Sequence, residues 1–353
     1  MAFSIQKLLI QAYMKWFPIP LPPPDSFKDQ TVLVTGGTSG LGLAAAVHFV
    51  NLGAAEVIIT SRNSARSKTA LATIERETGG RSKGRVRVMD LDMSRYASVV
   101  AFAEEVKKIN RGKGGIDTVV LNAGLSTVEP TRGEEGWDQN IQVNTLSTVL
   151  LALLLLPWMK AERANRSAPA HLAVVGSGRH LEPNIQEWKE WASETSLLEH
   201  FSKPENWPGS SMMYATTKLM AQYAVNELVK MALGPDGHPE VIINTMCPGL
   251  VASDLSRDLN KMGIVVALIA PIFLGIFAKS PSNGARTYMA ACLTTESEHG
   301  KFIKFYSSDA DYQEKADVVI TGEDGREMQA LVWSEMKAEF TAKVPETREI
   351  LKL

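Results

Sequence analysis

A glycine-rich turn between two apolar segments constrains the fold of this chain more than any other feature. Residues 35–42 read TGGTSGLG, between the apolar residues 31–34 and 43–50. Glycine lets the backbone turn sharply and lets a pyrophosphate approach, while the free amides at a helix start attract the anion. A second apolar strand, residues 56–61, follows at the spacing of a βαβ unit. The pattern predicts an α/β fold with a doubly wound parallel sheet, the Rossmann fold.

The same turn predicts a dinucleotide site. The residues that we expect to contact the cofactor there are Gly36, Thr38, Ser39, Gly40, Leu41 and Gly42. An NAD-binding chain usually carries an acidic residue about twenty positions after the last glycine. This chain has Ser61-Arg62-Asn63 instead. Because Arg62 would attract a 2′-phosphate and no carboxylate would repel one, we expect NADP(H) rather than NAD.

Tyr214 and Lys218 form the second informative pair. Tyr214 is the only one of the seven tyrosines with a lysine four residues later. Positions four apart share a helix face, and a nearby positive charge lowers the pKa of a phenol by favouring phenolate. Such a phenol can exchange a proton with an alcohol or a carbonyl. The pair therefore predicts a hydride-transfer enzyme, and the alternative is an amphipathic helix without a chemical role.

From about Phe27 onwards the sequence resembles the classical short-chain dehydrogenase/reductase family, and within it the retinol-dehydrogenase-like reductases of fungi. The resemblance rests on motifs in family order: Thr35 to Gly42, Asp92, Asn122-Ala123-Gly124, Asn144, Ser177, Tyr214 with Lys218, and Pro248-Gly249. It implies one extended Rossmann-type domain over residues 31–353, preceded by a helix and a proline-rich arm over residues 1–30.

The resemblance also implies a catalytic set. Tyr214 would be the proton donor, Ser177 would hold the substrate oxygen, Lys218 would tune Tyr214 and orient the ribose, and Asn144 would hold a relay water. The chain departs from the family pattern beside the serine. Gly176 replaces the more usual first serine and Gly178 follows, and two flanking glycines are expected to loosen the placement of Ser177.

Further cofactor contacts follow from the resemblance. Asp92 would bind the adenine amine, with Asp90 as a rival. The remaining residues expected around the ribose and nicotinamide are Asn122, Ala123, Gly124, Tyr214, Lys218, Pro248, Gly249, Val251 and Ser253.

The implied activity is NADP(H)-dependent interconversion of a ketone or aldehyde with an alcohol, on a hydrophobic small molecule of fungal secondary metabolism. The alternative is a non-redox enzyme of the same fold, such as a dehydratase, an epimerase or a cyclase, that retains the NADP site. A third reading is a non-catalytic protein that binds NADPH. The intact serine, tyrosine and lysine favour the redox reading.

Two segments extend the family pattern. The insertion 181–211 contains aromatic and proline residues and is expected to form a wall of the substrate pocket, with packing as a satellite cluster as the alternative. The segment 254–280 is expected to be an apolar substrate lid. Its residues 262–278 are seventeen in number without a charge, which is short of the ~20 needed to span a bilayer. We therefore expect a lid that contacts lipophilic substrates and also a membrane surface peripherally.

Composition limits the remaining classes. The formal net charge of −2 and the lack of a basic block argue against nucleic-acid binding. Two cysteines suit a reducing compartment, so a cytoplasmic location is expected. The six scattered histidines lack metal-ligand spacing. The family often pairs through the helices expected at residues 144–159 and 214–231, which implies a homodimer or a tetramer. The alternative is a monomer in which the N-terminal arm and the lid cover these faces.

Overall fold

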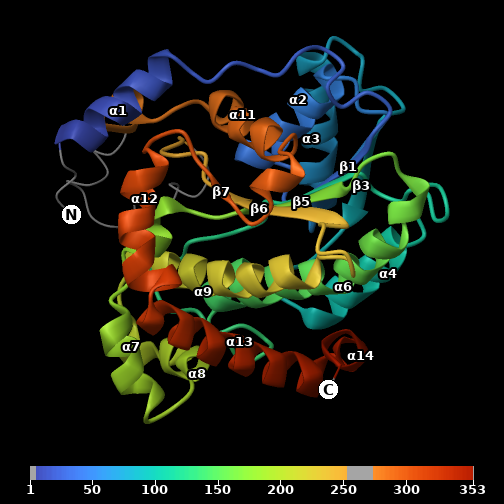
Figure 1. Cartoon of the computed structure of the whole chain (residues 1–353). Coiled ribbons are helices and arrows are strands. Elements are labelled where there is room, and N and C mark those ends of the chain that lie inside the picture. Colours follow the sequence, from blue (N-terminus) through green and yellow to red (C-terminus); the bar gives the residue numbers. More distant parts are fainter. Residues whose placement is uncertain (1–4, 253–272, 353) are drawn as a thin grey trace.

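The computed structural model of the chain describes residues 5–252 and 273–352. Its centre is a sheet of seven parallel strands in the order β3-β2-β1-β4-β5-β6-β7 (Figure 1). The strands are β1 (Thr31–Val34), β2 (Glu56–Ser61), β3 (Val86–Asp90), β4 (Thr118–Leu121), β5 (Ala170–Val175), β6 (Val241–Met246) and β7 (Phe302–Ile303). The predicted doubly wound parallel sheet is confirmed. The strand order reverses between β1 and β4, and such a switch point opens a crevice at the carboxyl ends of the strands.

Helices cover both faces of the sheet (Figure 1). One face carries α2 (Gly40–Asn51), α3 (Ser64–Glu77) and α11 (Pro281–Ala291), and the other carries α4 (Tyr96–Val106), α6 (Thr148–Ala161) and α9 (Ser210–Met231). Successive side chains of a strand point to opposite faces. Leu33 of β1 accordingly joins the hydrophobic core on the α6 side, whereas Val32 and Val34 join the core on the α2 side. Because both faces are buried, the central strands β1 and β4 are largely apolar, whereas the edge strand β3 contains Arg87 and Asp90.

The most apolar helical segment of the described residues lies inside the molecule. It runs from Gln139 to Ala161 through α5 (Gln139–Ile141), the π-helix η1 (Gln142–Ser147) and α6. Its length and hydropathy would suffice to cross a membrane, but 89% of its most apolar window is buried within the fold. Core helices of globular proteins show the same composition, so burial accounts for this segment.

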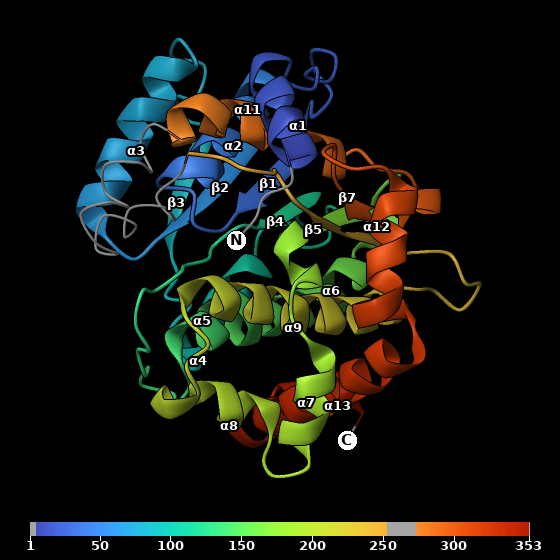
Figure 2. The ribbon, with the colours of Figure 1, turned by 90° about the vertical axis from the view of Figure 1, so that its left-hand side faces the viewer.

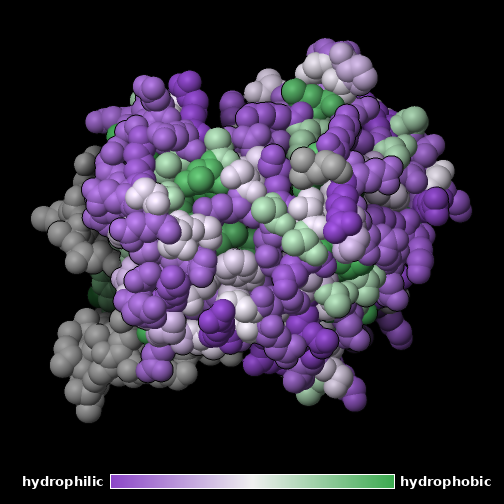
Figure 3. Space-filling view, turned by 90° about the horizontal axis from the view of Figure 1, so that it is seen from below, coloured by the Kyte–Doolittle hydropathy of each residue, from purple (hydrophilic) through white to green (hydrophobic). Residues whose placement is uncertain are grey.

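Two C-terminal helices, α13 (Glu323–Lys343) and α14 (Thr347–Leu351), add a third layer beneath α6 and α9 (Figures 1 and 2). Helix α12 (Asp309–Ala316) lies at the side, near β7. Leu150, Leu154 and Met220 on the covered helices are almost completely buried. The faces through which relatives were expected to pair are therefore covered by the chain's own C-terminal helices. Hydrophilic side chains dominate the face seen from below, with only small apolar areas between them (Figure 3).

The insertion belongs to this third layer. It forms α7 (Ile185–Ala192) and α8 (Leu197–Ser202), which lie beside α13 (Figure 2). The rings of Trp188 and Phe201 lie 5.3 Å apart and both are buried in the larger core. Both carboxylate oxygens of Glu335 on α13 accept hydrogen bonds from the backbone at the start of α8, at 2.9 and 3.0 Å. Trp188 and Phe201 therefore pack in the core, as in the alternative reading of the insertion, and do not form the expected wall of a substrate pocket.

The N-terminal helix and arm pack on the body. Helix α1 (Ile5–Trp16) lies near the carboxyl edge of the sheet. The amide of Leu250 donates a hydrogen bond to Gln11 Oε1 at 3.2 Å, and the Lys15 ammonium donates to the Gly275 carbonyl. Arg286 of α11 donates to the Ile19 carbonyl at 2.9 Å. Residues far apart in the sequence thus meet beside the loop that follows β6.

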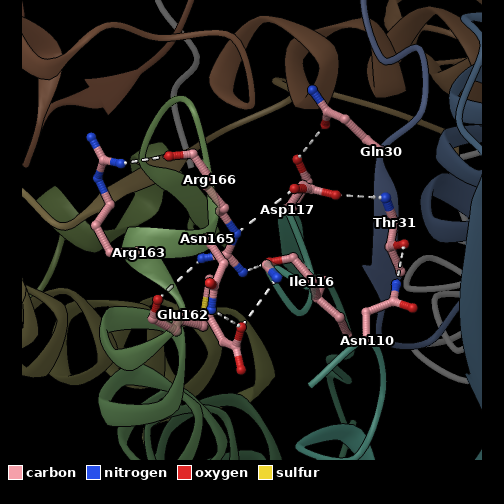
Figure 4. Close-up of polar contacts among 12 residues, drawn as sticks. Gln30, Thr31, Asn110, Ile116, Asp117, Glu162, Arg163, Asn165 and Arg166 are labelled. Carbon is pink, nitrogen blue, oxygen red and sulfur yellow. Dashed lines mark hydrogen bonds and ion pairs between the residues drawn. The ribbon is translucent and has the colours of Figure 1, made fainter. Parts of the chain in front are cut away.

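Polar side chains connect the amino ends of the strands at the opposite edge (Figure 4). The Asp117 carboxylate accepts a hydrogen bond from the Thr31 amide at 2.8 Å and lies 3.7 Å from Arg166 Nε. Arg166 also donates to the Ile116 carbonyl at 2.6 Å, and Glu162 accepts from the Gly112 amide at 2.7 Å. The network ties β1 and β4 to the turn after α6, so we assign it a structural role.

Candidate active site

The glycine-rich turn has the geometry that the sequence predicts. Gly36 and Gly40 adopt φ angles of +66° and +54°, which side chains with a Cβ rarely tolerate. A Cβ at Gly37 would lie 2.5 Å from the Ile59 side chain, and one at Gly42 would collide with the Gly36 carbonyl. Ser39 precedes α2 without a side-chain capping bond. The first amides of α2 are therefore free to bind an anion.

Asn122 at the end of β4 holds this turn in place. Thr35 Oγ1 accepts hydrogen bonds from the amides of Asn122 and Ala123 at 2.9 and 3.0 Å, and Asn122 Nδ2 donates to the Thr35 carbonyl at 2.8 Å. Tyr288 of α11 donates its hydroxyl hydrogen to Asn122 Oδ1 at 2.8 Å. Asn122 thus shapes the cofactor crevice from behind. The sequence analysis missed Tyr288, because no local pattern connects it to a motif 166 residues away.

Arg62 and Asp92 lie together at the ends of β2 and β3. Arg62 Nη1 is 3.4 Å from Asp92 Oδ1, and the same oxygen accepts bonds from the Ser94 amide at 3.0 Å and the Ser94 hydroxyl at 2.7 Å. Burial alone would raise the pKa of Asp92, but the bonds from Ser94 and the charge of Arg62 hold that pKa below its usual value. Asp90 is exposed. Asp92 is thus the carboxylate that lies beside Arg62, and the choice between Asp92 and Asp90 at the adenine stays a prediction.

Ser177, Tyr214 and Lys218 converge at the carboxyl end of β5. Ser177 lies two residues after this strand, and Tyr214 and Lys218 come from successive turns of α9. The Ser177 hydroxyl accepts a hydrogen bond from the Arg179 amide at 3.3 Å and lies close enough to the Tyr214 hydroxyl to lower its pKa. The Lys218 ammonium donates to the Val175 carbonyl at 2.7 Å and lies 5.6 Å from the centre of the Tyr214 ring. The structure therefore brings the three predicted catalytic side chains together.

Asn144 connects this helix to the loop after β4. Its carboxamide accepts from the Leu125 amide at 2.8 Å and donates to the Leu125 carbonyl at 2.8 Å and to Thr217 Oγ1 at 3.2 Å. It lies within η1, and π-helical turns often occur at functional sites. A Cβ at Gly124 would lie 3.1 Å from Asn144 Oδ1 and 3.9 Å from Lys218 Nζ. Asn144 and Lys218 thus meet around the end of β4.

The acidity of the pair differs from the sequence-based expectation. Burial raises the pKa of Tyr214, and the nearby Cys247 thiol adds to this, whereas the bond from Ser177 lowers it. The expected lowering by Lys218 is not found, so that prediction was wrong for the protein alone. The reason is burial, because it brings the pKa of Lys218 below that of Tyr214, so the lysine is already neutral at the pH where Tyr214 ionises. Burial also lowers the pKa of Lys218 from 10.5 to about 8.

The glycines around Ser177 fulfil a steric requirement rather than loosening the loop. A Cβ at Gly178 would collide with the Tyr306 hydroxyl, and one at Gly176 would lie 3.3 Å from the Phe302 ring. The Gly176 amide also donates to the Met246 carbonyl at 2.8 Å. The expected looseness was therefore wrong, since both glycines are closely packed.

The loop after β6 lies next to the glycine-rich turn. Gly249 adopts a φ of +77°. A Cβ at Gly284 of α11 would lie 2.6 Å from the Val251 side chain and 2.8 Å from the Leu41 side chain, so both contact the same point of α11. Val251 is thus placed beside the predicted phosphate turn, whereas Gly249 lies against Gln11, Lys279 and Tyr306. Ser253 and most of the expected lid, residues 254–272, lie outside the described residues.

Together these features define a class of protein, the nicotinamide-dependent oxidoreductases with a Rossmann fold. The description of one matching family model is short chain dehydrogenase, and it covers residues 30–185. This chain belongs to the short-chain dehydrogenase/reductase family, as its fungal relatives show. It is 31% identical over 334 residues to short-chain dehydrogenase/reductase ffsI of Aspergillus flavipes, covering 94% of this chain and 92% of the relative. It is 33% identical over 287 residues to short chain dehydrogenase atnD of Emericella nidulans, covering 80% and 86%.

Solved structures share the fold. A short chain oxidoreductase of Pseudomonas aeruginosa PAO1 with bound NADPH and an atypical catalytic center matches 80% of this chain and 96% of its own, with a TM-score of 0.55 and 22% identity. A 3-oxoacyl (acyl-carrier-protein) reductase of Agrobacterium tumefaciens C58 with bound NADP covers 78% and 93%, with a TM-score of 0.54 and 20% identity. At these identities the likeness concerns the fold.

Proposed function

We propose that this chain is an NADP(H)-dependent oxidoreductase that interconverts a ketone or aldehyde with an alcohol on a hydrophobic small molecule. The observation that carries the proposal is the convergence of Ser177, Tyr214 and Lys218 beside the glycine-rich turn. The cofactor, when bound, supplies or accepts a hydride at the carbonyl carbon.

The side chains of this site manage the proton. In the reductive direction Ser177 donates a hydrogen bond to the carbonyl oxygen, and Tyr214 transfers its hydroxyl proton to that oxygen. The buried Tyr214 has a raised pKa, so it enters the reaction protonated. Lys218 places positive charge close to the phenolate that remains, which stabilises it. Asn144 holds the loop after β4 against the turn of α9 that carries both groups.

Three observations support NADP(H) rather than NAD. The Arg62 guanidinium is 59% exposed at the end of β2, and its partner Asp92 already accepts bonds from Ser94. A guanidinium at this place can donate two parallel hydrogen bonds to a 2′-phosphate. The structural relatives from Pseudomonas aeruginosa and Agrobacterium tumefaciens contain NADPH and NADP. A role in fungal secondary metabolism is the pathway-level proposal, supported by the fungal origin of the relatives.

The test is oxidation of NADPH by the purified protein with a panel of apolar ketones and aldehydes, followed at the nicotinamide absorbance band. We expect Tyr214→Phe to lower kcat/KM by about 10³-fold, the order expected for loss of a general acid. Tyr13→Phe is the matched control, because Tyr13 lies on α1 and is 63% exposed. Full turnover by Tyr214→Phe contradicts the proposal. Substrate conversion without a change in absorbance supports the non-redox alternative instead.

A further inference from the structure

Three side chains that the sequence analysis did not single out converge beside Ser177. Tyr306 follows β7, and its hydroxyl lies against Gly178, the residue after Ser177. A Cβ at Gly249 would lie 3.3 Å from Lys279 Nζ and 3.6 Å from the Tyr306 ring. Cys247 Sγ lies between them and accepts from the amides of Gly178 at 3.3 Å and Gly249 at 3.4 Å. We call Cys247, Lys279 and Tyr306 the side cluster.

The side cluster adjoins the catalytic groups. The Cys247 thiol is close enough to influence the pKa values of Tyr214, Lys218 and Lys279. The cluster lies where β5, β6 and β7 end, which is the edge at which ligands bind in parallel α/β sheets. A ligand oxygen at the cluster would therefore belong to the same molecule as the carbonyl held by Ser177.

Both polar ends of the side cluster lack an oxygen or nitrogen partner within the described residues. The Tyr306 hydroxyl is buried without a hydrogen bond of good geometry. The Cys247 sulfur lies close enough to raise the pKa of this hydroxyl, but sulfur is a weak acceptor. Lys279 is 2% exposed, and no hydrogen bond or ion pair of its ammonium is found in residues 5–252 and 273–352. Buried polar groups are normally paired, so these two point to a ligand.

The charge of Lys279 indicates the kind of ligand. Burial lowers the pKa of this ammonium from 10.5 to about 8, so it still carries a proton at pH 7. A buried ammonium with no partner among the described residues is costly, and an anionic oxygen offsets that cost better than a neutral one. Tyr306 can donate a second hydrogen bond to the same oxygen. The described residues offer Lys279 no carboxylate partner of their own.

We propose that Lys279 and Tyr306 bind an anionic oxygen of the substrate, a carboxylate or an enolate, next to the carbonyl that Ser177 and Tyr214 hold. The substrate class is then an oxo acid or an enolised dicarbonyl compound with an apolar remainder. This inference rests on the proposed carbonyl chemistry. It assigns Lys279 and Tyr306 to substrate selection and leaves proton transfer to Tyr214.

The test compares matched acids and esters. The probes are phenylglyoxylate and 4-oxo-4-phenylbutanoate, each with its methyl ester, so that only the anionic oxygen changes. The readout is the ratio of kcat/KM for acid over ester within each variant. We expect wild type to prefer one of the acids, and Lys279→Met to lower that ratio by about 10- to 100-fold, the range for one charge-assisted hydrogen bond. Lys279→Arg should retain most of the ratio, and Tyr306→Phe should lower it about 3- to 10-fold.

Lys189→Met is the control for loss of a lysine, because Lys189 lies on α7 and pairs with Asp324 and Glu327 at the surface. Its acid-to-ester ratio should equal that of wild type. An equal ratio in wild type and Lys279→Met overturns the inference, as does a wild-type preference for both esters. A weaker NADPH affinity of Lys279→Met, measured by nicotinamide fluorescence, would place Lys279 at the cofactor and also overturn it.

Binding without turnover separates this inference from the proposed function. Calorimetric titration of the NADP-loaded protein with each acid and its ester should show tighter binding of one acid, and that difference should be lost in Lys279→Met. If no probe is reduced but the acid still binds through Lys279, the carbonyl chemistry fails and the anion site stands. If ketones are reduced without any dependence on Lys279, the anion site fails and the carbonyl chemistry stands.

Discussion

Replacing Lys218 by methionine should abolish activity and also change how the stability of the ligand-free protein depends on pH. The Lys218 ammonium is 6% exposed, and burial lowers its pKa from 10.5 to about 8. This lowering corresponds to about 3 kcal/mol by which the folded state disfavours the charged form. The buried charge of Lys218 thus destabilises the folded protein, although the proposed reaction needs that charge beside Tyr214.

The sign follows from the two pKa values. Below pH 8 the lysine is protonated in both states, and the folded protein bears the full cost. Between pH 8 and 10.5 the folded state releases its proton first, so the cost fades as pH rises. Methionine removes it at every pH, although the Val175 carbonyl then loses its partner, a loss of about 1–3 kcal/mol that does not depend on pH.

The measurement is urea unfolding of the ligand-free protein at pH 7 and at pH 10.5. The free energy of unfolding of Lys218→Met minus that of wild type should be about 3 kcal/mol larger at pH 7 than at pH 10.5. Lys230→Met on the same helix is the control, because Lys230 is 65% exposed and pairs with Glu227. It should show little such difference. If the stability of Lys218→Met relative to wild type is the same at both pH values, burial of a charged Lys218 is refuted.

Four further outcomes are expected. Arg62→Ala should lower kcat/KM for NADPH about 10- to 100-fold and leave that for NADH within a few fold, and an equal loss for both would contradict a 2′-phosphate contact. His180 is completely buried, and burial lowers its pKa to about 3. The free energy of unfolding should therefore fall on acidification from pH 6.5 to 4.5, by about 2 kcal/mol more in wild type than in His180→Gln. Arg166→Met should lower the free energy of unfolding by about 3 kcal/mol, because the Asp117 carboxylate and the Ile116 carbonyl lose their partner; a change below about 0.5 kcal/mol would show that the network at the amino edge is not stabilising. Light scattering should give a monomer, since α13 and α14 cover the pairing faces, and a dimer would show that pairing uses another surface.

The sequence predicted those parts of the fold and site that depend on neighbouring residues. The glycine-rich turn, the apolar strands and the spacing of Tyr214 and Lys218 are local patterns, because backbone sterics and helix periodicity act over a few residues. The residue types alone were also enough to place Ser177 and Asn144 in a family order. These predictions needed no knowledge of which elements pack together.

Tertiary structure decided the remainder. The convergence of Lys279 and Tyr306 on Gly178 and Gly249 joins elements far apart in the sequence, and no local pattern specifies such a meeting. Tyr288 behind Asn122 is a similar case. The acidity of Tyr214 was mispredicted because the pKa values of Tyr214 and Lys218 both depend on how deeply the two side chains are buried, which packing determines. Sequence determined which groups are present and their local geometry, whereas long-range packing determined their neighbours and the solvent that they lose.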